Sequence, residues 1–144
     1  MIKYNSEDLV NHHGVSAVIK NNKGDILMQN HVKYGFWTIP VGKVKKNQTV
    51  IDGLKEEVFE ECNINILNHK ELNFTELKYI RDGNKVTVLN HIYEVLEYIG
   101  EVKNNEPHKH SEQIFLSIEE IVKKPYLSDA TILFLETLGI NREV

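Results

Sequence analysis

Several short stretches of mainly hydrophobic residues, bounded by turn-forming residues, are predicted to be β-strands. The first two stretches, Val15–Lys20 and Ile26–Gln29, are separated by Asn21–Asp25, a run of turn-forming residues. Further strands are predicted from Ile64 onward and over Phe74–Ile80, Val86–Val95 and Gln113–Leu116. The polar or glycine-rich stretches between them are predicted to be loops, over His31–Lys46 and Gly100–Ser111.

Three stretches are predicted to be helices. Thr49–Cys62 is the longest, and Asn63 after it tolerates the left-handed backbone conformation with which helices commonly end. A short helix is predicted over Ile118–Lys123, and Ser128 can cap a final helix that ends near Gly139. Because strands and helices do not alternate regularly, we expect an α/β fold in which helices sandwich a mixed β-sheet.

The composition is that of one globular domain. The chain has 144 residues, 41% hydrophobic and 26% charged, so we expect a single domain over residues 1–144. A net charge of −4 indicates neither general nucleic-acid binding nor a polybasic membrane anchor. The lone Cys62 excludes an internal disulfide and a multi-cysteine metal site. Since no secretory signal or membrane-spanning run is visible, we expect a soluble cytoplasmic protein.

The longest predicted helix carries a cluster of acidic residues. Four of its glutamates form like-charge pairs four residues apart, Glu56 with Glu60 and Glu57 with Glu61. Each such pair destabilises a helix by roughly 0.2–0.5 kcal/mol. A local conflict of this kind is expected at a functional site.

Two of these carboxylates are predicted to lie at the edge of the buried helix face. At about 100° per residue, the apolar stripe runs from Val50 at zero to Val58 at about 80°. Glu61 then falls at about 20° and Glu57 at about 340°, whereas Glu60 falls at about 280°. Two partly buried carboxylates need either a raised pKa or a nearby cation. A divalent cation that prefers oxygen ligands could bind both carboxylates. A di-iron site is excluded because Glu-x-x-His does not occur in the chain.

The segment Gly42–Ile64 resembles the Nudix box, whose pattern is G-x5-E-x7-R-E-U-x-E-E-x-G-U, where U is an aliphatic residue. Gly42 matches the opening glycine, Glu57–Glu61 matches E-U-x-E-E, and Ile64 matches the final aliphatic position. The preceding stretch Trp37–Lys43 is similar to the W-x-L-P-G-G-K that commonly leads into the box. The resemblance implies the Nudix fold, an α/β/α sandwich with a mixed β-sheet.

Three positions depart from the family pattern. Gln48 replaces the first glutamate, Glu56 replaces the arginine, and Asn63 replaces the second glycine. In the family the arginine holds carboxylates of the box in place. The reversed charge at residue 56 therefore calls for a substitute cation, and the nearby candidates are Lys45, Lys46 and Lys55.

The resemblance implies a Mg²⁺-dependent hydrolase, with Mn²⁺ as an alternative ion, that cleaves the pyrophosphate linkage of a nucleoside triphosphate or related nucleotide. It assigns Glu57 and Glu61 as metal ligands, Glu60 as a third ligand or a catalytic base, and the backbone carbonyl of Gly42 as a further ligand. A carboxylate cluster alone would repel a pyrophosphate, whereas a divalent cation inverts the local sign and activates a bound water.

Each candidate residue outside the box can also be explained without a catalytic or binding role. Glu106 and Glu112 lie before the last predicted strand and are candidates for a catalytic base, with an exposed surface carboxylate as the alternative. His108 and His110 suggest a metal pair, but without a third placed ligand we do not assign one.

Substrate contacts are predicted just before the box. Lys43 is a candidate for a phosphate contact, with a solvated lysine as the alternative. Trp37, or its neighbours Tyr34 and Phe36, is a candidate for stacking on a base, and core packing is the alternative for Trp37.

Two other functions stay open. A degenerate family member would bind a nucleotide without turning it over, which the changes at Gln48 and Glu56 motivate. A purely structural domain would expose its acidic helix to solvent. The partner we expect is a small-molecule nucleotide, with no nucleic acid and no membrane, and the resemblance allows a homodimer.

Overall fold

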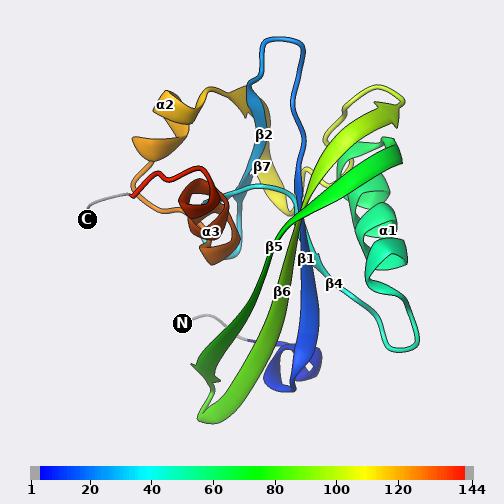
Figure 1. The fold of residues 1–144 in the computed structure, drawn as a ribbon. Helices are drawn as coiled ribbons and strands as arrows, with labels where there is room; N and C mark the ends of the chain where they lie inside the picture. The colour runs from blue at the N-terminus through cyan, green and yellow to red at the C-terminus, as the bar shows by residue number, and fades with distance from the viewer. Residues whose placement is uncertain (1–3, 142–144) are drawn as a thin grey trace.

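Helices cover both sides of the β-strands in the computed structural model, which describes residues 4–141 (Figure 1). Helix α1 lies on one side, and α2 and α3 lie on the other, which confirms the predicted α/β/α class. The first and last three residues of the predicted domain, 1–3 and 142–144, lie outside the described residues. In chain order the elements are η1 (Ser6–Leu9), β1 (His12–Val18), β2 (Ile26–His31), β3 (Trp37–Thr38), β4 (Val41–Lys43), α1 (Val50–Cys62), β5 (Asn65–Arg81), β6 (Asn84–Ile99), β7 (His110–Leu116), α2 (Ile118–Val122) and α3 (Asp129–Thr137).

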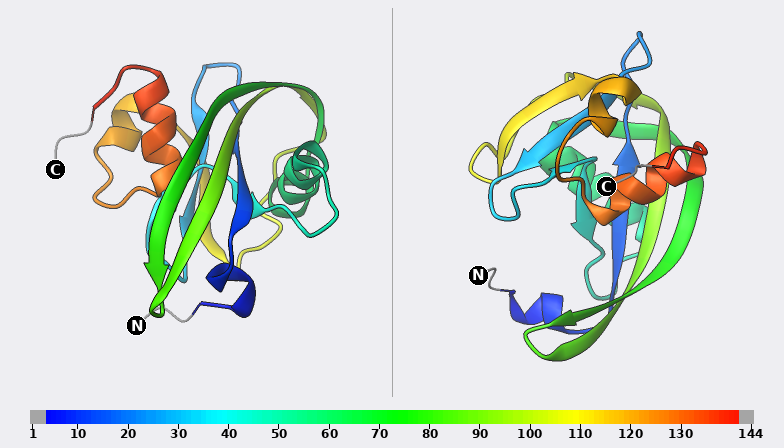
Figure 2. Two further views of the ribbon diagram at one scale, coloured as in Figure 1. Left: turned by 60° about the horizontal axis from the view of Figure 1, so that its bottom comes forward. Right: turned by 90° about the vertical axis from the view of Figure 1, so that its left-hand side faces the viewer.

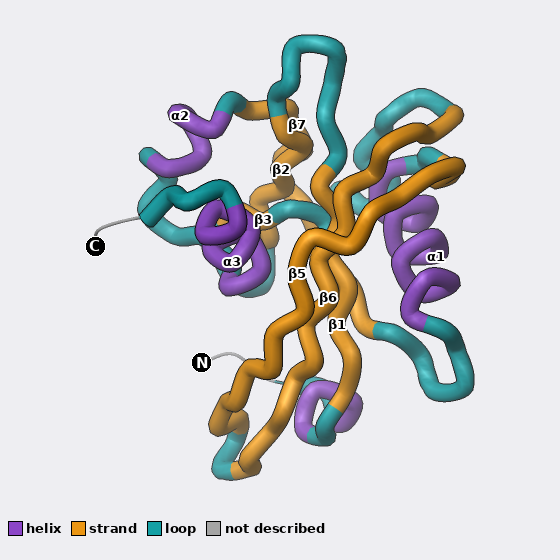
Figure 3. Tube along the Cα trace, viewed as in Figure 1, coloured by secondary structure: helices purple, strands orange, loops and turns teal. Residues whose placement is uncertain are grey.

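Within residues 4–141 the strands form two sheets (Figure 3). The larger is the mixed sheet expected from the sequence, with strand order β4-β1-β6-β5 and a parallel pairing of β1 with β6. The smaller is antiparallel, with strand order β3-β2-β7. The pairing of β2 with β7 places Gln29 opposite Gln113 and His31 opposite His110, which brings polar side chains together below α1.

The alternation along β1 divides the core into two apolar clusters. Val15 and Ala17 face α1, where Leu54 and Val58 of the helix pack against them. Val18 faces the other side and belongs to the cluster that α3 covers, with Ile26, Ile39, Phe134 and Leu135 among its members.

Helix α1 ends at Cys62 as the sequence predicts and begins one residue later than predicted, because Thr49 caps it. The hydroxyl of Thr49 accepts a hydrogen bond from the backbone N–H of Asp52 (3.1 Å), as an N-cap does. Asn63 adopts the left-handed conformation (φ 66°), and its backbone N–H donates to the carbonyl of Phe59. The caps fix where the helix begins and ends, and its apolar side chains pack it against β1.

The structure contains strands that the residue pattern did not indicate. β3 and β4 lie inside the predicted loop His31–Lys46 and have two and three residues, too few to show a period. β5 and β6 are longer than predicted and meet at a tight turn where Asp82 and Gly83 have positive φ. Figure 2 shows this hairpin as a long curved ribbon with η1 beside its far end, where Arg81 Nη1 donates to the carbonyl of Asp8 (3.2 Å).

In the described part of the chain, no helix combines the length and the apolar character that crossing a bilayer requires.

Candidate active site

A cleft of about 820 Å³ runs along the inner edge of α1 and receives residues from both sheets. Glu57 and Glu61 of α1 line it together with Gly42 and Lys43 of β4. The loop before β7 adds Glu106, His108, Lys109 and His110, and the β2–β3 segment adds His31, Tyr34 and Phe36. The cleft therefore places acidic, basic and aromatic side chains around one open space.

Glu57 and Glu61 are held in the cleft at an energetic cost. Burial raises the pKa of the Glu57 carboxyl to about 7, and the charge of Glu60 adds to this shift. Glu61 is only 3% exposed, and its burial, followed by the charge of Glu57, raises its pKa well above the usual value. Among the described residues, no group donates a hydrogen bond to Glu61 Oε2. A divalent cation would relieve both the burial of these carboxylates and their repulsion.

Gly42 leaves the space that the Glu57 side chain occupies. A Cβ atom at residue 42 would overlap the carboxyl group of Glu57. The backbone of β4 and the carboxylate of α1 are therefore in direct contact, and only glycine permits this contact without displacing the carboxylate.

Two of the three box residues that depart from the family pattern, Gln48 and Glu56, bind each other, and neither is among the described residues that line the cleft. Gln48 Nε2 donates to Glu56 Oε2 (2.8 Å), and Lys45 forms an ion pair with the other oxygen of Glu56. The side chain of Gln48 also accepts from the backbone N–H of Lys45 (2.9 Å). Of the three candidate lysines, Lys45 is the one that pairs with Glu56, and the trio fixes the loop that leads into α1.

A buried polar relay lies behind Glu61. Gln113 Nε2 donates to Gln29 Oε1 (2.9 Å), and Gln29 Nε2 in turn donates to Glu61 Oε1 (3.2 Å). His110 Nε2 lies 3.4 Å from the same oxygen of Glu61. Burial lowers the pKa of the His110 imidazole to about 4, and the neighbouring His31 adds to this shift, so the ring is neutral at neutral pH.

A family model described as NUDIX domain matches residues 10–136 of this sequence. The chain belongs to the Nudix family. This match spans β1 through most of α3 and so includes every side chain of the cleft that the box contributes.

Similar proteins support the assignment of the fold. A MutT NUDIX hydrolase from Burkholderia pseudomallei superimposes with a TM-score of 0.75 at 22% identity, covering 89% of this chain and 98% of that one. The NUDIX domain of Shewanella oneidensis NrtR, in a complex with ADP ribose, gives a TM-score of 0.70 at 12% identity, covering 94% of this chain and 92% of that one. The 8-oxo-dGDP phosphatase NUDT18 of Danio rerio is 38% identical over 53 residues, which are 35% of this chain and only 16% of that protein.

Three of the site residues predicted from the sequence of this Nudix domain are not among the described residues that line the cleft. Trp37 is 9% exposed and packs in the core beneath α3, as the structural alternative for it proposed. Glu112 is exposed on β7, and Glu60 is exposed on α1 next to Glu57, whose pKa it affects. Lys43 lines the cleft but forms an ion pair with the buried Asp8 of η1.

Two residues that contact Glu61 were not assigned from the sequence, and only His110 of the two lines the cleft. Gln29 interrupts the buried apolar run of β2 as a polar residue, and this interruption is a signal that could have drawn attention to it. His110 was set aside for want of further ligands, and the structure supplies carboxylates beside it from Glu61 and Glu106. Their importance depends on the β2–β7 pairing, which the Nudix fold provides.

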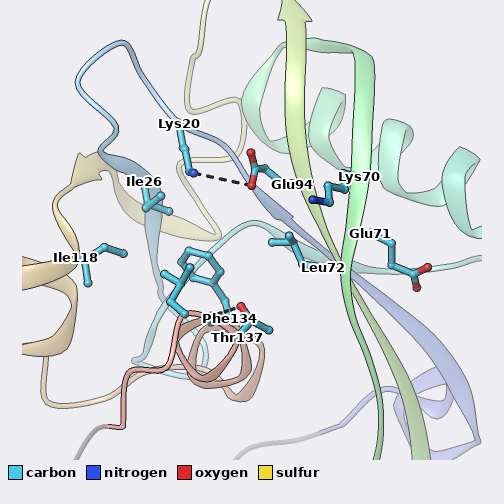
Figure 4. Close-up of a pocket in the computed structure, with 10 residues that line it drawn as sticks. Lys20, Ile26, Lys70, Glu71, Leu72, Glu94, Ile118, Phe134 and Thr137 are labelled. Atoms are coloured by element: carbon cyan, nitrogen blue, oxygen red, sulfur yellow. Dashed lines mark hydrogen bonds and ion pairs between the residues drawn. The ribbon is translucent and has the colours of Figure 1, made fainter.

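A second, smaller pocket of about 320 Å³ lies between α3 and the β5–β6 hairpin (Figure 4). Lys20 and Glu94 point toward each other at its rim and form an ion pair of 3.8 Å. Ile26, Leu72 and Phe134 supply apolar side chains. None of the predicted site residues is among the described residues that line it.

Proposed function

We propose that this Nudix domain hydrolyses the pyrophosphate linkage of a small nucleoside diphosphate derivative in the presence of Mg²⁺ or Mn²⁺. The observation that carries the proposal is the buried Glu61 carboxylate, which has an oxygen without a hydrogen-bond partner among residues 4–141 and lies beside Glu57 in an open cleft. Such an oxygen is costly unless a cation or a ligand completes its environment.

The donor set fits a divalent cation with oxygen ligands. Glu57 and Glu61 would supply carboxylate oxygens, and the backbone carbonyl of Gly42 and the exposed Glu60 are the further ligands that we propose. A bound ion of this kind neutralises phosphate charge and lowers the pKa of a water molecule. Side chains of the cleft would then orient the phosphates and accept the proton of that water.

Glu106 is the proton acceptor that we favour over Glu112. Glu106 lines the cleft, and Lys109 holds its carboxylate by an ion pair of 3.2 Å. Glu112 has an exposed side chain on β7, and Glu60 remains a candidate at the outer edge of the acidic cluster. A base in this reaction must reach the attacking water, which the position of Glu106 allows.

The aromatic and basic side chains of the cleft suit a nucleotide. Tyr34 and Phe36 stack on each other with ring centroids 5.3 Å apart, and both line the cleft, so we propose them as the contact for a base. Lys43 is positioned to exchange its partner Asp8 for a substrate phosphate. The nucleotides named for the relatives, such as ADP ribose and 8-oxo-dGDP, belong to the chemical class that we propose.

A substrate panel tests the proposal. Purified protein is incubated with nucleoside triphosphates, nucleoside diphosphates, ADP ribose and dinucleoside polyphosphates, with Mg²⁺ or Mn²⁺ and with EDTA, and products are quantified. We expect hydrolysis of at least one class that requires the ion. No turnover with ligand-induced thermal stabilisation would identify a nucleotide-binding module, and the absence of both would identify a structural domain.

The free thiol of Cys62 is buried, and on this ground we propose a reducing cytoplasm as the location. A homodimer stays a prediction.

A further inference from the structure

Strand β5 forms one edge of the larger sheet, and in the described part of the chain β6 is its only strand partner. Figure 1 shows the half of β5 nearest the turn to β6 as the outer strand of the sheet. Over residues 73–81 the pairing with β6 continues without a register shift. Within residues 4–141, the backbone of residues 73–80 makes no hydrogen bond to a segment other than β6. The open side of β5 is therefore a row of donors and acceptors that another strand can pair with.

The two faces of this segment differ. The intervening side chains are half-buried, and Leu77 and Tyr79 among them line the cleft. The opposite face exposes four side chains, Phe74, Glu76, Lys78 and Ile80. Phe74 is 54% exposed and Ile80 77% exposed, so apolar surface flanks the two charges. Glu76 and Lys78 form an exposed ion pair of 4.0 Å with each other.

The exposed face is complementary to itself when two copies of β5 run antiparallel about a two-fold axis at Leu77. Residues whose numbers lie equally far from 77 on its two sides are then opposite each other. Glu76 lies opposite Lys78 of the second copy, and Lys78 lies opposite its Glu76. Phe74 and Ile80 are paired across the two copies in the same way. Opposite charges and apolar side chains at facing positions stabilise a pair of strands.

Neighbouring positions of the axis do not give this match. An axis at Glu76 places Glu76 opposite itself, and an axis at Lys78 places Lys78 opposite itself. Like charges directly opposite each other destabilise a pair of strands. Axes farther along, at Thr75 or Tyr79, place a charged side chain opposite an apolar one. The charge pattern of β5 therefore selects the axis at Leu77.

We propose that β5 pairs with β5 of a second copy of this chain about a two-fold axis at Leu77, which joins the larger sheets of the two copies. The contact uses the same edge on both copies, so it closes at a dimer and leaves no free β5 edge for further growth. On the cleft side, Thr75 of the second copy lies opposite Tyr79, so the second copy extends the strand wall of the cleft. The inference does not depend on the proposed function.

Sedimentation of the full chain at micromolar to millimolar concentrations tests the pairing. We expect a concentration-dependent dimer, which Glu76→Lys and Lys78→Glu each weaken by about 10-fold or more, since each places like charges opposite each other. The two changes together exchange the charges, so we expect the double variant to recover the dimer. Lys23→Glu, the same charge reversal in the exposed turn before β2, is the matched control. A monomer at every concentration overturns the proposal. A dimer that both single variants retain, or that the double variant does not recover, also overturns it.

Oxidative cross-linking tests the position of the axis. Residues opposite each other on antiparallel strands have Cα atoms about 4.5–5.5 Å apart, which a disulfide can span. We expect Leu77→Cys to form a covalent dimer. Thr75→Cys is the control, because its two copies lie four residues apart along the strands, about 14 Å, and we expect no cross-link. The natural protein, with only the buried Cys62, gives the baseline. No cross-link in Leu77→Cys, or one as fast in Thr75→Cys, overturns the proposed register. Neither experiment depends on hydrolysis, so a failure here leaves the proposed function as it stands.

Discussion

Gly42 lies against the carboxyl group of Glu57 so closely that a methyl group at residue 42 would overlap it. The contact joins β4, which carries the first residue of the box pattern, to α1, which carries its first carboxylate in the cleft. The opening glycine of the box therefore leaves room for the carboxylate of Glu57.

We expect Gly42→Ala to lower metal-dependent turnover by about 100-fold, since a displacement of about 1 Å at a reacting site has an effect of that size. The Glu57 side chain can rotate away from the new methyl group, so the melting temperature should change little. Gly14→Ala is the matched control, because a Cβ there meets its neighbours at ordinary distances of 3.4 Å or more. Full activity of Gly42→Ala would show that the position of Glu57 is unimportant.

We expect Glu61→Gln to lower metal-dependent turnover by at least about 100-fold and to remove the thermal stabilisation that Mn²⁺ gives. Without metal the variant should be at least as stable as the natural protein at pH 8, because it removes a carboxylate whose burial and closeness to Glu57 disfavour its charged form. Thermal melts with and without Mn²⁺ measure both effects, and Glu119→Gln on the exposed surface of α2 is the control. An unchanged response to Mn²⁺ would contradict the assignment of Glu61.

The pKa of Glu57 predicts how the stability of the protein depends on pH. Its folded pKa of about 7 exceeds the usual 4.5, so the folded state binds protons more tightly than the unfolded state between these values. The stability it contributes without metal is complete below about pH 4.5 and is lost as the pH rises through about 7. Because a metal binds the deprotonated carboxylate, the melting-temperature gain from Mn²⁺ should grow between pH 5.5 and pH 8. A gain that is independent of pH would argue against Glu57 as a ligand.

The pairing of Gln48, Glu56 and Lys45 predicts a non-additive double substitution. Glu56→Arg places a second cation beside Lys45, so we expect it to lower the melting temperature rather than to improve the enzyme. Gln48→Glu added to Glu56→Arg restores an opposite charge in the same place and should recover most of the loss. Chemical denaturation of the two single variants and the double variant measures the coupling. Additive effects would show that residues 48 and 56 do not interact.

The sequence predicted the elements that carry a long, regular pattern. Helix α1 was predictable because its apolar stripe and Asn63, which ends it, are local signals. The projection of that helix also placed Glu57 and Glu61 near the buried face. In the structure Glu57 is half-buried and Glu61 is buried. Strands β3 and β4 were not predictable, since two or three residues show no period.

The rest of the site depends on contacts between distant segments. Gln29 can donate a hydrogen bond to Glu61 only because the fold brings β2 next to α1. His110 contacts Glu61 only because β7 pairs with β2. Neither residue belongs to a local motif. The partner of Glu56 was open among three lysines for the same reason, because the fold of the loop before α1 decides that it is Lys45.

A crystal of the full chain soaked in Mn²⁺ tests most directly whether the carboxylates at the inner edge of α1 bind a cation. We predict an anomalous difference peak within coordination distance, about 2.0–2.3 Å, of oxygens of both Glu57 and Glu61. The soak uses Mn²⁺ at a concentration that saturates Nudix hydrolysis, or at a millimolar concentration. Well-ordered carboxylates without such a peak would then contradict the account.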